Sequence, residues 1–504
     1  MNLVEGAHDA GRAAAQAISR TEQKALGQFM TPPAIARHMA LSLVARASMD
    51  NCVRVLEPAA GAGVLAAAVV EAILRRTDRP ARIELLMWEI DPRLHPNLQK
   101  LAKEMRVAAE AAGVRFEAKI YGEDFLLSRL ALWGQSIEHL LVISNPPFFK
   151  LAGDDPRAKA HSYAVWGQPN IYGIFMAACA RLVGRGGGWC FITPRSWMSG
   201  AYFTATRRTI LRYLSIEQLH EFVSRTEGFE DDAVLQETVI AWATPRPAVE
   251  SGGRILLTRS HGMADLDSAA VQALPFERVV GGDEHAMLSL PHAVDEFSTG
   301  WTATLADHGL QVSTGPVVAF RAAEHLRSAA EEGTVPLLWM QHIKQQRVLW
   351  PINKKREFIR ASAANAWMLV PNLPMVLMRR FSPKEDERRC TAAAYVGELP
   401  GATLGLENHL NYIYRPGGMM SRDEVQGLAA LLSSRAVDAH FRALAGTTQV
   451  NATELRKLPL PPMSVICRIG RALPAAPTLV EVDAVVEREL GLEQEHDEAR
   501  AASA

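Results

Sequence analysis

The chain has 504 residues, with 54 Lys and Arg against 55 Asp and Glu, so its formal net charge is −1. Its length exceeds the roughly 250–300 residues at which single hydrophobic cores stop growing, which predicts at least two domains. Hydrophobic residues make up 48% of the chain and charged residues 22%, a balance that excludes wholesale disorder and fibrous proteins. No uninterrupted apolar stretch approaches the ~20 residues of a membrane span. Five scattered cysteines without a CxxC pair predict reduced thiols in a cytoplasmic protein and no metal site.

Strand-like and helical segments alternate through the first half of the chain, starting at Val53. Strands are predicted at residues 53–58, 83–91, 114–125, 139–148 and 187–194, and helices at 63–76, 96–112, 171–183 and 202–214. This alternation is typical of an α/β domain whose parallel sheet is covered by helices on both faces. Two further strand-like runs, at 216–223 and 233–244, lie close together and predict an antiparallel pair at the edge of the sheet.

Composition changes along the second half and suggests the domain boundaries. Residues 1–20 are predicted to be an N-terminal extension with a loose helix, 21–245 the α/β domain, 246–290 a linker, 291–465 a second domain of α+β type, and 466–504 an acidic tail. The linker prediction rests on the Pro- and Gly-rich stretch TPRPAVESGGR. Between Trp339 and Arg389 there are 11 Lys and Arg against 4 Asp and Glu, so the neutral total conceals a basic region.

A glycine-rich turn, EPAAGAG (57–63), follows the first predicted strand. Glycines between a strand and a helix let the backbone approach a ligand, although a simple tight turn has the same pattern. Three acids, Glu57, Glu89 and Asp124, end the first three predicted strands. Because the carboxyl ends of parallel strands meet at one edge of a sheet, these acids predict a ligand site there. Glu89 can accept hydrogen bonds from ribose hydroxyls, and Asp124 can accept from an adenine amino group.

The sequence NPPF (145–148) directly follows the buried run LLVIS and is the sharpest signal in the chain. Prolines lack backbone donors, so the carbonyls around them remain available as acceptors. The carboxamide oxygen of Asn145 and the carbonyl oxygen of Pro146 can together accept both hydrogens of an exocyclic amine. Held in this way, the nitrogen offers its lone pair for attack, while Phe148 gives the heterocycle a flat face to stack on. A proline turn that caps a strand is the ordinary alternative.

Three motifs in this order, GQFMTPP (27–33), EPAAGAG and NPPF, resemble the γ-class of S-adenosylmethionine-dependent DNA adenine-N6 methyltransferases. The resemblance covers about residues 21–244 and implies a Rossmann-like methyltransferase sheet with S-adenosylmethionine as cofactor. It places the cofactor on Thr31, Glu57, Ala59, Gly61, Gly63, Glu89, Asp124 and Phe125, the target base on Asn145, Pro146, Pro147 and Phe148, and Phe229 over the other face of that base.

Three segments of the second half, at 312–321, 406–416 and 446–462, resemble the BsuBI/PstI type of modification methyltransferase. That type works beside a restriction endonuclease and methylates an adenine in a short palindrome, CTGCAG for the members that name it. The resemblance therefore implies double-stranded DNA as partner, a target-recognition domain over 291–465, and a cognate endonuclease as functional partner.

A duplex substrate also fits the charge distribution. A base inside a duplex must be flipped out for chemistry, which requires a second domain to hold the phosphates and to contact neighbouring bases. The basic stretches 344–360 and 379–389 supply candidate contacts, for which we single out Lys344, Arg347, Lys354, Lys355, Arg379 and Arg380. For either stretch alone, a solvated charged face is an equally good interpretation.

Two other functions remain open from the sequence. NPP motifs also occur in RNA and protein amine methyltransferases, although the large basic second domain argues against these. A DNA-binding specificity subunit with an inert methyltransferase domain is the second alternative. The intact set of Thr31, Glu57, Gly61, Glu89, Asp124 and Asn145 argues against it, because an inert copy would be free to lose at least one.

Overall fold

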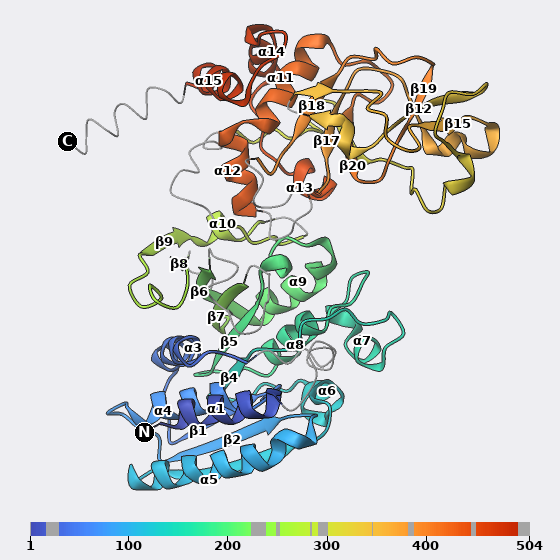
Figure 1. Ribbon diagram of the computed structural model, residues 1–504. Helices are drawn as coiled ribbons and strands as arrows, with labels where there is room; N and C mark the ends of the chain where they lie inside the picture. Colours follow the sequence, from blue (N-terminus) through green and yellow to red (C-terminus); the bar gives the residue numbers. More distant parts are fainter. Residues whose placement is uncertain are drawn as a thin grey trace. The chain divides into compact units, whose positions relative to one another are not determined.

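The computed structural model describes residues 2–16, 30–222, 238–247, 253–282, 285–290, 301–344, 346–381, 388–444 and 450–491. The chain forms two compact units, Met1–Ser289 and Leu290–Ala504 (Figure 1). Across these described ranges, no helix has both the length and the apolar character needed to cross a membrane.

The first unit is built on a nine-stranded sheet with the order β3-β2-β1-β4-β5-β7-β6-β8-β9. Its strands are β1 (Cys52–Glu57), β2 (Arg82–Trp88), β3 (Arg115–Tyr121), β4 (Leu140–Ser144), β5 (Gly188–Pro194), β6 (Leu214–Phe222), β7 (Thr238–Pro245), β8 (Arg254–Ser260) and β9 (Val271–Pro275). The first five strands pair in parallel, and β7 runs antiparallel to both β5 and β6. The ends of β1 to β5 therefore lie at one edge.

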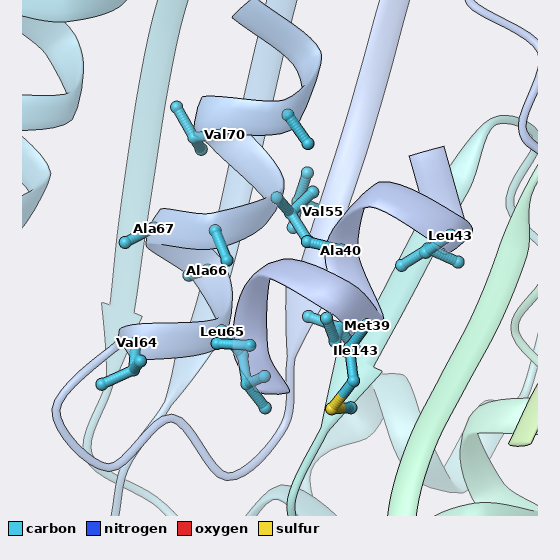
Figure 2. Packing of buried hydrophobic residues seen from close by; sticks show 14 of the residues in the cluster. Met39, Ala40, Leu43, Val55, Val64, Leu65, Ala66, Ala67, Val70 and Ile143 are labelled. Carbon is cyan, nitrogen blue, oxygen red and sulfur yellow. The ribbon is translucent and has the colours of Figure 1, made fainter. Parts of the chain in front are cut away.

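Helices cover both faces of this sheet. They are α1 (Leu3–Gln16), α3 (Pro33–Arg46), α4 (Val64–Leu74), α5 (His95–Ala111), α6 (Arg129–Trp133), α7 (Pro156–Ala160), α8 (Ile171–Ala180), α9 (Thr204–Tyr213) and α10 (Phe276–Val279). On one face, α1, α3, α4 and α5 share a hydrophobic core with alternate residues of the strands. Figure 2 shows Leu65 and Ala66 of α4 and Met39 of α3 gathered around Val55 and Ile143. Strands β4 and β5 are buried at every position, because helices such as α8 cover the other face.

The predicted α/β fold is confirmed, including the antiparallel pairing of β6 with β7, but the predicted edge position of this pair is wrong, because β8 and β9 lie beyond it. Two of the sequence predictions for this unit need correction. The segment 246–290 is not a linker, because it contains β8 and β9, which extend the sheet beyond the β6–β7 pair. The N-terminal helix α1 is not loose, because Leu3, Val4 and Ala7 are buried in the core of the unit.

The second unit combines small sheets with a helical layer, which fits the predicted α+β class. One sheet has the strand order β10 (Gln311–Thr314), β20 (Leu410–Tyr414), β17 (Met375–Arg379) and β18 (Ala392–Tyr395). A second sheet has the strand order β11 (Leu326–Arg327), β15 (Phe358–Arg360), β12 (Thr334–Leu338), β19 (Thr403–Leu406) and β16 (Leu369–Pro371). In a third, β13 (Ile343–Lys344) pairs with β14 (Arg347–Val348). The helices are α11 (Arg422–Ser433), α12 (Arg435–Leu444), α13 (Ala452–Arg456), α14 (Met463–Ala472) and α15 (Leu479–Leu490).

The C-terminal boundary also moves. A tail was predicted from residue 466, but α14 and α15 belong to the core of the second unit. Helix α14 packs backbone to backbone on α11, since a Cβ built on Gly427 would lie 1.8 Å from the Ile466 carbonyl oxygen. The acidic residues beyond Gly491 lie outside the described part of the chain.

Candidate active site

The glycine-rich turn connects β1 to α4 at the carboxyl edge of the sheet. Gly61 and Gly63 have positive φ angles of 53° and 82°, which side chains with a Cβ rarely adopt. Gly63 also faces α5, because a Cβ there would lie 2.6 Å from Cδ2 of Leu101. Gly63 therefore serves the turn and its packing, whereas Gly61 lies beside a ligand cavity.

The first two strand-end acids hold the turn in shape. Glu57 is buried, and its Oε2 accepts a hydrogen bond of 2.9 Å from the Ala66 backbone N–H in the first turn of α4. Glu89 accepts from the Gly61 N–H (2.7 Å) and from the Asp91 N–H (2.8 Å). Burial raises the pKa of both carboxyls, and that of Glu57 rises well above its ordinary value.

The third acid stands at the end of β3 beside an aromatic wall. Asp124 accepts a hydrogen bond of 2.9 Å from the Leu126 N–H, and its Oδ2 lies 3.6 Å from the Arg157 guanidinium. Phe125 is buried and meets Trp88 edge to face, with 5.3 Å between ring centroids. An acceptor thus stands next to a flat apolar surface.

The NPPF motif follows β4 at the same edge. The side-chain amide N–H of Asn145 donates to the Thr31 hydroxyl oxygen at 3.1 Å, which joins the motif to the threonine-proline motif 114 positions earlier. This bond orients the carboxamide so that its oxygen is the group that can accept from a substrate amine. Phe148 packs edge to face on Tyr172, with ring centroids 5.8 Å apart. The Tyr172 and Ser196 hydroxyl oxygens lie 2.7 Å apart, within hydrogen-bond distance.

A cavity of about 410 Å³ collects most of these residues. Of the predicted cofactor and base residues, Thr31, Glu57, Ala59, Gly61, Glu89, Asp124, Phe125, Asn145 and Pro147 line it. Gly63, Pro146 and Phe148 lie outside this lining. Phe229 falls in a stretch, 223–237, that is outside the described residues. The three acid-bearing strand ends and the NPPF loop therefore meet at one site.

The sequence interpretation missed one wall of the cavity, which is helix α1. Gly11, Ala14 and Ala15 line the cavity, and a Cβ on Gly11 would lie 2.8 Å from the Ala62 Cβ in the glycine-rich turn. The helix is anchored at its other end, where Glu71 of α4 accepts a hydrogen bond of 3.0 Å from the Leu3 N–H. The sequence indicates this wall only through the run GRAAAQ (11–16), in which small residues recur at helical spacing.

The residues of the cavity fit an adenosine group with an amino-acid tail. Glu89 offers a carboxylate at the position where strand-end acids bind ribose hydroxyls, and Asp124 offers an acceptor beside the flat face of Phe125. Thr31 and the glycine-rich turn lie in the same wall as Asn145. These residues suit S-adenosylmethionine, and they lie beside Asn145, where a substrate amine would be held for methylation.

Comparisons with known proteins decide the family. A family model described as Eco57I restriction-modification methylase matches residues 95–229. The type II methyltransferase M.BsuBI of Bacillus subtilis is 32% identical over 464 residues, covering 88% of this chain and 89% of the relative. The type II methyltransferase M.PstI of Providencia stuartii is 30% identical over 463 residues, covering 89% of each chain. The chain belongs to the family of type II methyltransferases.

This methyltransferase also resembles the Type IIL restriction-modification enzyme MmeI in complex with DNA, at 12% identity and a TM-score of 0.51, over 87% of this chain and 70% of that one. That likeness concerns the fold alone. Membership in the family confirms the resemblance carried by the motifs: the protein is an enzyme that methylates DNA, and S-adenosylmethionine is its cofactor.

The second unit of the methyltransferase holds the six predicted DNA contacts, in different settings. Lys344 and Arg347 are exposed and face each other across the β13–β14 pair. Arg379 donates two hydrogen bonds, of 2.9 and 2.6 Å, to the Ile343 carbonyl. Arg380 donates to the Asn408 carbonyl at 3.2 Å. Arg379 and Arg380 therefore help to stabilise the fold of their own unit.

Lys354 and Lys355 stand on a braced loop. The buried carboxylate of Glu357 accepts hydrogen bonds from Nε2 of His342 (2.7 Å) and from the Ile352 N–H (2.8 Å). The Trp339 ring lies under Lys354, with 4.9 Å from Nζ to the ring centroid. The loop therefore presents its cations on a fixed backbone. The sequence stretch indicated the cations but not the buried His342–Glu357 pair beneath them.

Proposed function

We propose that this enzyme transfers the methyl group of S-adenosylmethionine to N6 of an adenine flipped out of double-stranded DNA. The observation that carries the proposal is the bond between Asn145 and Thr31, which fixes the NPPF carboxamide at the wall of the cofactor cavity. A carboxamide oxygen and a proline carbonyl beside each other suit the two hydrogens of an exocyclic amine.

The residues of the chain act on the amine in three ways. Asn145 and Pro146 accept its two N–H bonds and turn the nitrogen lone pair away from the ring. Phe148 supports the base from one face, and the apolar surroundings exclude water. Bound S-adenosylmethionine supplies an electrophilic methyl group on a sulfonium. Methylation would make the amine nitrogen acidic enough to lose one proton as the sulfonium becomes a thioether, so the residues here would not have to include a strong general base.

The second unit is proposed to hold the duplex by its phosphates. Lys344, Arg347, Lys354 and Lys355 project into solvent or stand at its boundary, and the loop of Lys354 is braced from beneath. Cations of this kind contribute salt-dependent affinity without sequence preference. The roles of Arg379 and Arg380 are proposed to be structural, because their guanidinium groups bind carbonyls of their own unit.

The similarity to M.PstI and M.BsuBI supports a finer proposal, that the target is the adenine of CTGCAG and that the enzyme is the modification partner of a restriction endonuclease. The test uses short duplexes that carry CTGCAG or a permuted site, with radiolabelled methyl donor. Transfer to the CTGCAG duplex and none to a duplex already N6-methylated at that adenine is expected. Equal labelling of the permuted duplex would overturn the target sequence, and labelling of the premethylated duplex would overturn the target atom.

A further inference from the structure

An exposed aromatic pair stands beside the base-binding motif. Trp166 is 58% exposed and Tyr202 is 57% exposed, and both belong to the first unit. The segments that carry them adjoin, because a Cβ built on Gly167, the residue after Trp166, would lie 2.8 Å from Cδ1 of the Tyr202 ring. Single exposed aromatic residues are ordinary, but two on adjoining segments beside a substrate site offer a surface to a ligand.

Trp166 belongs to the segment that leaves the NPPF motif and returns to it, residues 149–170, which we call the arm. The arm closes on itself where the Leu151 N–H donates to the Pro169 carbonyl (3.0 Å) and the Gln168 side-chain amide donates to the Leu151 carbonyl (2.6 Å). Its last hydrogen bond runs from the Ile171 N–H to the Phe149 carbonyl, at 3.1 Å. The segment that follows Trp166 is thus anchored beside the NPPF motif.

Tyr202 reaches the same place from the end of β5. It lies in a short 3-10 turn, Ala201–Phe203, after the strand that neighbours β4 in parallel. Below the turn, Phe203 packs on Tyr172 with ring centroids 5.1 Å apart, and Tyr172 packs on Phe148. A row of rings therefore leads from Phe148 through Tyr172 to Phe203, the residue next to Tyr202.

Bases are the partners that fit such a surface. When an adenine leaves the duplex, the faces of its neighbours and of its former partner lose their stacking contacts, and an aromatic side chain can restore them. Lys150 is exposed on the arm, opposite Asn170, and offers a cation for a nearby phosphate. We propose that Trp166 and Tyr202 stack on DNA bases left unstacked when the target adenine enters the active site. This inference rests on the proposed DNA adenine methylation.

The test places 2-aminopurine at the target adenine of a duplex and follows its fluorescence with full-length protein. Trp166→Ala and Tyr202→Ala should each lower the fluorescence at saturating protein and reduce kcat/KM for DNA by at least about fivefold, the range for losing one base–aromatic stack. Trp166→Phe and Tyr202→Phe keep a ring and should retain most activity. The affinity for S-adenosylmethionine should be unchanged, because neither residue lines the cofactor cavity.

Trp133→Ala is the matched control, since Trp133 is 63% exposed but stacks with Arg129 on α6. Wild-type fluorescence and kinetics in both alanine variants, or an equal loss in Trp133→Ala, would overturn the inference. Loss in the Phe variants as large as in the Ala variants would also overturn it, by showing a structural role. If the wild-type enzyme makes no N6-methyladenine, the proposed function is refuted instead. The duplex affinities of the alanine variants would then still show whether Trp166 and Tyr202 bind DNA.

Discussion

The two units of the enzyme differ in how their functional residues come together. In the first unit, the site residues predicted from sequence come from five separate parts of the chain and line one cavity, at the edge where the parallel strands end. In the second unit, basic residues of the same region of the sequence have different surroundings. Lys355 lies on the exposed surface, whereas Arg379 donates hydrogen bonds to the Ile343 carbonyl. Topology thus positions the chemistry of the first unit, while local bracing decides which cations of the second can meet a ligand.

The largest effect expected from this contrast is that of Asn145→Ala in the first unit. Loss of the carboxamide removes an acceptor that acts on the amine during transfer, so kcat should fall by roughly 100-fold or more. The affinity for S-adenosylmethionine, measured by calorimetry, should change little. A variant that loses cofactor binding instead would show that Asn145 mainly supports the fold of the cavity through Thr31.

A second effect concerns pH and Glu89. Burial raises the pKa of this carboxyl, so it takes up its proton at a higher pH than an exposed glutamate does. The carboxylate is the form that accepts from ribose hydroxyls; cofactor affinity should therefore be complete above the raised pKa and decline as the pH falls through it. Glu89→Gln should bind the cofactor roughly tenfold more weakly and give a flatter pH profile. Equal pH profiles for both proteins would contradict this role.

Helix α1 offers a test of the cavity wall that the sequence did not predict. Gly11→Val should raise the cofactor Kd by about fivefold or more, because the new side chain meets Met30, which lines the cavity, and Ala62 of the glycine-rich turn. Gly6→Val is the matched control, since a Cβ on Gly6 of the same helix meets nothing within 4 Å. Similar Kd values for the two variants would remove α1 from the cofactor site.

The smallest effects are expected in the second unit. Lys354→Ala and Lys355→Ala should each weaken duplex binding a few-fold and lower the slope of log affinity against log salt concentration by about 0.9, the value for one phosphate contact. Lys100→Ala, on an exposed position of α5, is the control and should leave the slope unchanged. An unaltered slope in the Lys354 and Lys355 variants would place the duplex elsewhere on the unit.

The sequence predicts the first unit well because its signals are local and its topology is simple. Buried parallel strands leave nearly continuous apolar runs, and Glu57, Glu89 and Asp124 follow from the rule that strand ends share an edge. Strand β8 was missed because the Pro- and Gly-rich stretch before it predicts a linker. The close approach of Gly63 to Leu101 was also missed, since long-range packing leaves no motif in the chain.

In the second unit, a charge count could indicate a basic region but could not assign roles within it. The sequence treats Arg379 and Lys355 alike, although one guanidinium is bonded to a carbonyl and one ammonium faces solvent. The difference arises from β17, which brings Arg379 beside Ile343, 36 residues earlier in the chain. Such pairing depends on tertiary structure and has no counterpart in the composition.

Analysis of the methylated product would show whether the Asn145 site methylates adenine N6 in DNA. Purified enzyme is incubated with unmethylated genomic DNA and methyl-deuterated S-adenosylmethionine, and the nucleosides are analysed by mass spectrometry, with Asn145→Ala in parallel. We expect deuterated N6-methyldeoxyadenosine from the wild-type enzyme and almost none from the variant. Label on cytosine, or equal labelling by both proteins, would contradict this expectation.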